Sequence, residues 1–212
     1  MKKWFKKTVA IVLTAAMAMS IGMPAFAEEA IVQDTQEIKS KLVITNPDNG
    51  EKWTWDVTDA LKETPVFFSN VQNPSVSTTE VELSLNDYLI ETYAVTDSVE
   101  DSKSSDIVLR AGLTYNRDVD TTGLVSIYNV FGSTTNVGLY YAENRQVYWR
   151  NPGAFVGGSY SPTSSSWNYS VNSKAGAYNS GAKPYTLLEC DVRVSGMTSS
   201  RTVELLCELD LT

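Results

Sequence analysis

The sequence predicts an all-β protein, in the form of an antiparallel β-sandwich of roughly nine to ten short strands, with a β-barrel as the alternative. Val, Thr, Tyr and Ser are frequent, and Gly and Asn turn signals recur at short intervals. Several stretches alternate apolar and polar residues, as a half-buried strand does, and no apolar period of 3.6 residues is sustained. These patterns favour strands joined by turns over a helical protein.

The first 27 residues have the three parts of a secretory signal. Four lysines precede an apolar run from Val9 to Met19, and Ala25 and Ala27 stand at the positions that a signal peptidase reads. We therefore expect cleavage after Ala27 and a secreted, extracellular protein. No later stretch reaches about 18 apolar residues, so we expect no membrane span in the mature chain. An uncleaved anchor is the alternative, which Pro24 and the short apolar run disfavour.

The expected mature chain is a flexible N-terminal arm, residues 28–40, followed by a single β-sandwich domain, residues 41–212. Loss of the four signal lysines takes the net charge from −8 to −12. Binding to a nucleic-acid backbone requires a basic face, which this composition does not supply. The same charge disfavours attachment to anionic lipids or anionic wall polymers. Nucleic acid is therefore excluded as an expected partner.

The predicted elements follow one another at short spacings. Residues 41–57 form a hairpin that turns at Pro47-Asp48-Asn49-Gly50, with Trp53 and Trp55 on one face. Residues 58–65 hold one helical turn before Pro65. Strand patterns then occupy residues 80–95, 106–116, 123–132, 136–141, 145–151 and 165–172.

The C-terminal stretch predicts a hairpin that contains both cysteines. Apolar residues alternate from Leu188 to Val194 and again from Val203 to Leu211, around the turn-like segment SGMTSSR. A turn between Thr198 and Ser199 places Cys190 directly opposite Cys207, both pointing inward. In an exported chain we expect these two cysteines to form a disulfide worth about 3 kcal/mol. Two buried thiols that act as small apolar residues are the alternative.

The composition restricts catalysis. The chain has no histidine, which excludes Ser–His and Cys–His nucleophile pairs and His-ligated zinc. Ser180 and Lys183 match S-x-x-K only formally, because the partner motifs of that chemistry are absent. The acidic loop from Asp97 to Asp106 fits no EF-hand and is interpreted as solvated. We expect no metal and no cofactor.

Aromatic residues supply the one positive functional signal. Tyr140, Tyr141, Tyr148 and Trp149 lie in one predicted hairpin, and neighbours on a strand face opposite ways, so at least one of each adjacent pair should be exposed. Flat rings beside amides and hydroxyls suit sugar rings. Packing against neighbouring strands is the structural alternative.

These observations favour a secreted, non-catalytic binding protein that recognises an extracellular glycan or protein through the four aromatic residues. An antagonist or toxin-like protein that acts on other cells is the first alternative. A hydrolase that uses two carboxylates is the second, although 25 acidic residues make some close pair inevitable. The expectation is therefore that the protein is not an enzyme.

Overall fold

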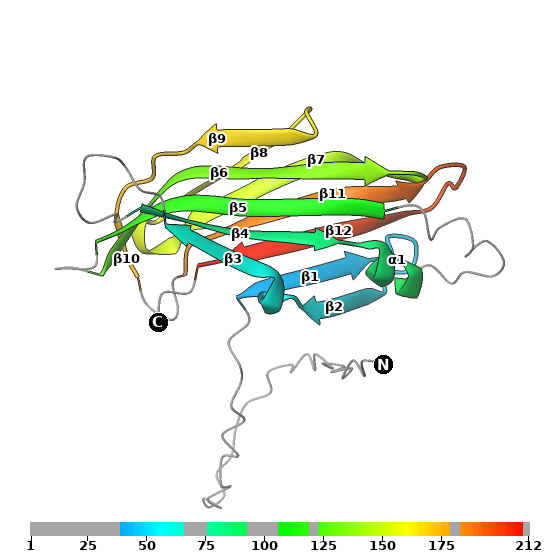
Figure 1. Ribbon diagram of the computed structural model, residues 1–212, viewed down its shortest axis with the longest axis horizontal. Helices are drawn as coiled ribbons and strands as arrows, with labels where there is room; N and C mark the ends of the chain where they lie inside the picture. Colours follow the sequence, from blue (N-terminus) through cyan, green and yellow to red (C-terminus); the bar gives the residue numbers. More distant parts are fainter. Residues whose placement is uncertain (1–38, 66–75, 93–105, 119–122, 179–182, 210–212) are drawn as a thin grey trace, which may run out of the picture. The chain divides into compact units, whose positions relative to one another are not determined.

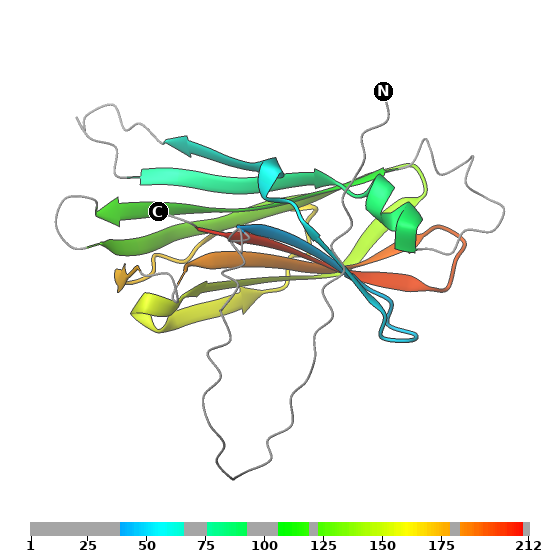
Figure 2. The same cartoon turned by 90° about the horizontal axis from the view of Figure 1, so that it is seen from below.

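The computed structural model describes residues 39–65, 76–92, 106–118, 123–178 and 183–209. Within these ranges, twelve strands form two antiparallel sheets that pack face to face (Figure 1). In Figure 2 the cyan and green strands of one sheet lie over the blue, red and orange strands of the other. The predicted all-β sandwich is thus confirmed, and neither sheet closes into a barrel. The predicted signal and most of the predicted arm lie outside the described residues.

The first sheet, called sheet A, contains the C-terminal hairpin at its centre. Within this sheet, every pair of adjacent strands is antiparallel. In spatial order its strands are β2 (Lys52–Asp56), β1 (Ser40–Thr45), β12 (Ser200–Glu208), β11 (Tyr185–Val194), β7 (Tyr140–Asn151) and β8 (Val156–Tyr160).

The second sheet, called sheet B, contains the longest strands. In spatial order these are β10 (Gly176–Ala177), β6 (Leu124–Val137), β5 (Asp106–Asp118), β4 (Val76–Ser84) and β3 (Leu61–Pro65). A further strand, β9 (Ser166–Ser170), pairs with β6 on the same side as β10. Two 3₁₀ turns, η1 (Thr58–Ala60) and η2 (Pro152–Ala154), precede β3 and β8. The helical turn expected in residues 58–65 is η1, and β3 follows it.

The core lies between the sheets and is filled by alternate residues of the central strands. Sheet B contributes Leu109 and Leu113 of β5, and sheet A contributes Leu188 of β11, Val203 and Leu205 of β12, all fully buried. This inward set has the period of two residues that the sequence predicts. The expected β1–β2 hairpin is also present, and Trp53 and Trp55 both pack against the core.

The register of the C-terminal hairpin differs from the expected one. Cys190 lies opposite Val203, and Cys207 lies opposite Thr186, so the two cysteines are not cross-strand partners. The turn closes around Gly196, whose φ of 87° is left-handed, instead of between Thr198 and Ser199. The alternation of inward residues is unchanged, because a register that shifts by an even number of residues keeps every side chain on its face.

The expected disulfide is wrong for the same reason. Both cysteines are buried free thiols. Cys207 is displaced along β12 by four residues from the partner of Cys190, which corresponds to about 13 Å. A disulfide requires Cα atoms within about 7 Å, so the bond cannot form in this register.

A short helix, α1 (Asn86–Thr92), replaces the second half of the strand expected over residues 80–95. Leu85 and Leu89 are both fully buried and lie four residues apart, which puts them on one side of the turn. Arg201 of β12 donates from its guanidinium to the carbonyl of Thr92 at 3.0 Å. A cation at the C-terminal end of a helix satisfies a carbonyl that has no partner within the helix.

Candidate functional site

A bulge in β7 decides which aromatic side chains reach the surface. The ladder between β7 and β11 shifts by one residue between Glu189 and Asp191, and Asn144 has a φ of 51° at this point. Because the bulge adds one residue to β7, the residues after it point to the opposite face from the one that regular alternation would give them. Tyr141 and Tyr148 lie an odd number of residues apart, yet both point away from the core.

The exposed fractions of the side chains confirm the expectation that at least one member of each aromatic pair is exposed. Tyr141 and Tyr148 are each 36% exposed, whereas Tyr140 is 5% exposed and Trp149 packs against the core. The four side chains do not form one surface. Two point inward, and the two exposed tyrosines stand about 20 Å apart along the strand.

Trp149 is held by the neighbouring edge strand. It pairs directly with Gly158 of β8. A Cβ atom built at Gly158 would lie 3.0 Å from Trp149 Nε1, so the absence of a side chain there leaves room for the indole. The sequence predicts that Trp149 contacts a ligand, but in the structure its side chain is not exposed on the outer face of the sheet.

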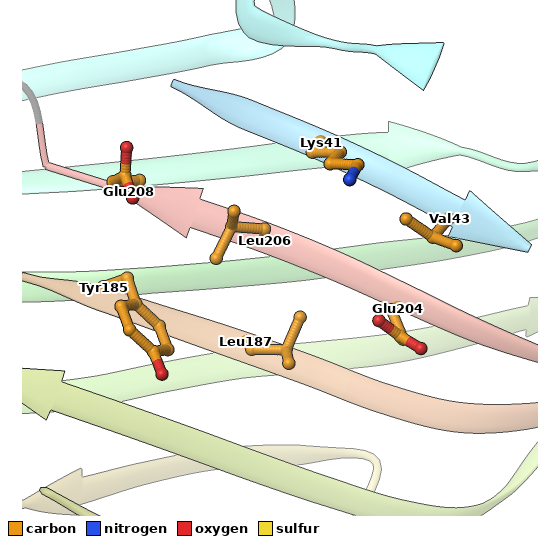
Figure 3. A pocket seen from close by; sticks show the side chains of 7 residues that line it. All are labelled: Lys41, Val43, Tyr185, Leu187, Glu204, Leu206 and Glu208. Carbon is orange, nitrogen blue, oxygen red and sulfur yellow. The ribbon is translucent and has the colours of Figure 1, made fainter. Parts of the chain in front are cut away.

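The outer face of sheet A carries a shallow groove that the aromatic signal did not identify (Figure 3). Its volume is about 280 Å³, near the lower limit of small-molecule pockets. All of its side chains are half-buried. They come from β1 (Lys41 and Val43), β11 (Tyr185 and Leu187) and β12 (Glu204, Leu206 and Glu208).

The ladder registers explain how these residues come together. Leu187 lies opposite Leu206, which makes an aliphatic floor, and Tyr185 lies opposite Glu208. Tyr148 of β7 is the cross-strand partner of Leu187 on its other side, so one of the four predicted aromatics borders the groove. Glu208 forms an ion pair with the buried Lys183 at 3.9 Å. The groove thus has an apolar floor with tyrosine and carboxylate groups around it.

Two carboxylates face each other beside the groove. Glu189 of β11 is the direct partner of Glu204 of β12. Burial raises the pKa of Glu189, and the charges of Glu204 and Asp191 raise it further. Asp191 itself accepts hydrogen bonds from Thr202 Oγ1 at 2.9 Å and Asn144 Nδ2 at 2.8 Å. Glu189 is therefore held closer to its protonated form than an ordinary glutamate side chain.

This juxtaposition follows from the observed register and was not predictable from spacing. The expected register places Arg193 opposite Glu204. In the structure Arg193 lies opposite Ser200 and forms its ion pair with Glu143 of β7 instead. Glu204 therefore keeps no cross-strand cation on β11 and meets Glu189. Alternation alone indicates that these carboxylates face outward, but not which of them are neighbours.

The other residues considered for catalysis or metal binding either stabilise the fold or lie outside the described residues. Ser180 and the acidic residues from Asp97 to Asp101 are not described. Asp106 accepts hydrogen bonds from the Ser84 hydroxyl at 2.7 Å and from the backbone N–H groups of Asn86 and Ile107, at the start of α1. No helix in the described ranges has the length and apolar character to cross a membrane. In the same ranges, no three Cys, Asp or Glu side chains are grouped to hold a metal ion.

Comparisons of the chain with protein-family models, with curated proteins and with solved structures found no match in any of the three.

Proposed function

We propose that the chain is a secreted, non-catalytic binding protein that recognises a neutral or cationic glycan on the outer face of sheet A. The observation that carries the proposal is the groove, in which Tyr185 lies opposite Glu208 at one end of an aliphatic floor and Glu204 lies at the other end (Figure 3). A sugar ring has an apolar face that packs on tyrosine and leucine, and hydroxyls that donate to carboxylates.

The charge of the groove limits the ligand. Glu204 and Glu208 outnumber Lys41 among its lining residues. Glu208 is paired with Lys183, but Glu204 has no such cation on β11 and meets the further carboxylate of Glu189. An anionic polymer would meet repulsion at this surface, in a chain that is already acidic. A neutral polysaccharide or one with amino groups fits the same surface without that cost.

The test is a pull-down of residues 28–212, the chain expected after cleavage, against insoluble polysaccharides and purified cell walls. We expect saturable binding that a soluble sugar competes with, and a loss of about tenfold in affinity for Tyr185→Ala and for Tyr148→Ala. Tyr141→Ala is the matched control, because it removes a tyrosine of equal exposure from the same face, away from the groove. Absence of binding to every polysaccharide, or equal loss in all three variants, would contradict the proposal.

A carboxylate-based hydrolase is the second candidate, and the Glu189–Glu204 pair favours it. The Cβ atoms of directly opposed residues lie about 4.5–5.5 Å apart, so the two flexible side chains can bring their carboxyl groups to the separation of about 5–5.5 Å that retaining glycosidases use. Burial and two neighbouring charges favour a protonated Glu189, as a general acid requires. Incubation with each bound polysaccharide separates the two candidates. Release of reducing ends that is lost in both Glu189→Gln and Glu204→Gln would replace binding with hydrolysis as the function.

A further inference from the structure

Most of the exposed large apolar side chains gather at one end of the sandwich. Of the six in the described ranges, four lie at the β6–β7 and β11–β12 hairpins, and we call this group the apolar tip: Val137 (49% exposed), Leu139 (40%), Tyr141 (36%) and Met197 (46%). The two hairpins leave the sandwich at the same end (Figures 1 and 2). A hydrogen bond from the backbone N–H of Ser195 to the carbonyl of Leu139, at 2.8 Å, joins them.

Each hairpin of the tip turns on a glycine. Gly138 and Gly196 have φ angles of 72° and 87°, which a residue with a Cβ atom adopts only at a cost. Leu139 and Met197 directly follow these glycines. Leu139 stands one residue before β7, and Met197 lies within the turn that joins β11 to β12. The apolar side chains are carried on protruding turns, whereas the sugar-sized groove lies on a sheet face.

The two turns of the apolar tip contain no charged residue, and the charged residues nearest to them in the ladders are Asp106, opposite Val137, and Arg193, opposite Tyr141. Residues 121–142 contain no Lys, Arg, Asp or Glu, and neither do residues 194–200. Arg193, the nearest cation along β11, is paired with Glu143. Among the described residues, the cation that lies opposite Tyr141 is thus already held by a carboxylate, and an anionic membrane would repel the acidic chain.

We propose that the apolar tip inserts into the headgroup region of a neutral, zwitterionic phospholipid surface. Aliphatic side chains on uncharged turns gain from burial at the acyl boundary, and a tyrosine ring suits the headgroup level. The turn backbone remains at a depth where water and headgroups satisfy its polar groups. A soft lipid surface accommodates separate protruding side chains, whereas a rigid protein partner would require a matching hollow for each.

The test is co-flotation of residues 28–212 with phosphatidylcholine vesicles and with vesicles that also contain phosphatidylserine. We expect binding to the first and weaker binding to the second. Leu139→Asp and Met197→Asp should each lower the vesicle partition coefficient by roughly tenfold. Phe155→Asp is the control, because Phe155 is 94% exposed but follows the opposite end of β7 from Tyr141.

Three outcomes overturn the proposal. The first is no co-flotation with phosphatidylcholine, and the second is stronger binding to the anionic vesicles. The third is a dimer in sedimentation velocity that Met197→Asp dissociates, since it would assign the apolar tip to a second copy of the chain. The result is separable from glycan binding, because Tyr148→Ala should leave vesicle binding intact and Met197→Asp should leave polysaccharide binding intact.

Discussion

Trp149 lies against Gly158, its direct partner across the β7–β8 ladder, where a Cβ atom would come within 3.0 Å of the indole nitrogen. The same relationship occurs twice more. Trp167 of β9 covers Gly132 of β6, and Phe131 of β6 covers Gly112 of β5. In each case a large ring occupies the space that a side chain would fill on the neighbouring strand. Aromatic side chains in this chain are therefore used to cover glycines as well as to meet solvent.

Trp149→Ala should separate packing from binding. Removal of the indole uncovers Gly158 and part of the core, so we expect the free energy of unfolding to fall by about 2–3 kcal/mol. Polysaccharide binding by the folded fraction should stay unchanged, because Trp149 points to the side of sheet A opposite the groove. Urea unfolding and the pull-down measure the two effects. A variant of native stability that no longer binds would return Trp149 to the ligand site.

Gly132→Ala tests one of these contacts between a ring and a glycine. A Cβ atom at Gly132 would lie 2.3 Å from the carbonyl oxygen of Arg110 and 2.6 Å from Trp167 Cζ2, so backbone or ring must move. We expect a loss of about 3 kcal/mol or more in the free energy of unfolding. Gly50→Ala, with nothing within 4 Å but a φ of 73°, should cost only about 1 kcal/mol. Equal losses in urea titrations would show that Trp167 does not cover Gly132.

The thiols of Cys190 and Cys207 should be inert in the folded protein. Burial raises the pKa of each to about 12, so almost no thiolate exists at neutral pH. We expect no reaction with Ellman's reagent in native protein, and two free thiols after denaturation without a reductant. Finding no thiol after denaturation would mean that the disulfide forms and that the hairpin register is the expected one after all.

The same two groups should make the fold less stable in alkali. Each folded-state pKa is raised from an ordinary value of 9.0, so the native state retains protons that the unfolded chain releases. Their stabilising contribution is complete below pH 9 and is lost as the pH rises towards 12. The slope is up to about 1.4 kcal/mol per pH unit for each thiol. Urea titrations between pH 8 and 10.5 should show a shallower decline in Cys207→Ala than in the unaltered chain.

The β11–β12 hairpin shows which features of the fold can be predicted from the alternation of apolar and polar residues. The inward and outward faces of β11 and β12 follow from a period of two residues, and both cysteines point inward as expected. The partner of each residue does not follow, because every even shift buries the same apolar set. The left-handed conformation of Gly196 selects one of these registers. Gly196 is visible in the sequence, but the segment SGMTSSR offers several other turn residues.

The candidate site likewise depends on features that alternation does not predict, namely a bulge and the registers between strands. The bulge at Asn144 puts Tyr141 and Tyr148 on one face, although regular alternation would separate them. The β11–β12 register brings Glu189 to Glu204 and the β1–β12 register brings Val43 to Glu204. The sequence therefore predicts that one residue of each adjacent aromatic pair is exposed. It does not predict the groove, which depends on cross-strand partners that lie far apart in the sequence.

Arg201→Met should detach the end of α1. The guanidinium is buried and supplies the donor for the carbonyl of Thr92, which methionine leaves without this partner. We expect a loss of about 1–3 kcal/mol in the free energy of unfolding and faster amide exchange over residues 86–92. Arg193→Met, which removes a half-exposed ion pair with Glu143, is the control and should cost less than about 1 kcal/mol. Unchanged exchange in α1 would contradict this role.

Glu189→Gln should stabilise the protein slightly at neutral pH. The raised pKa means that the native state binds the Glu189 proton more tightly than the unfolded chain does, so this group favours the fold in acid. That contribution is lost as the pH rises through the folded-state pKa, and at pH 7 repulsion from Glu204 and Asp191 remains. Glutamine removes this repulsion, and we expect a gain of a few tenths of a kcal/mol after solvent screening. Glu82→Gln, on the exposed face of β4, should show no such gain. Urea titrations at pH 5 and pH 7 check the sign: the advantage of Glu189→Gln should shrink at the lower pH, and an advantage that grows there would show that Glu189 is not held towards its protonated form.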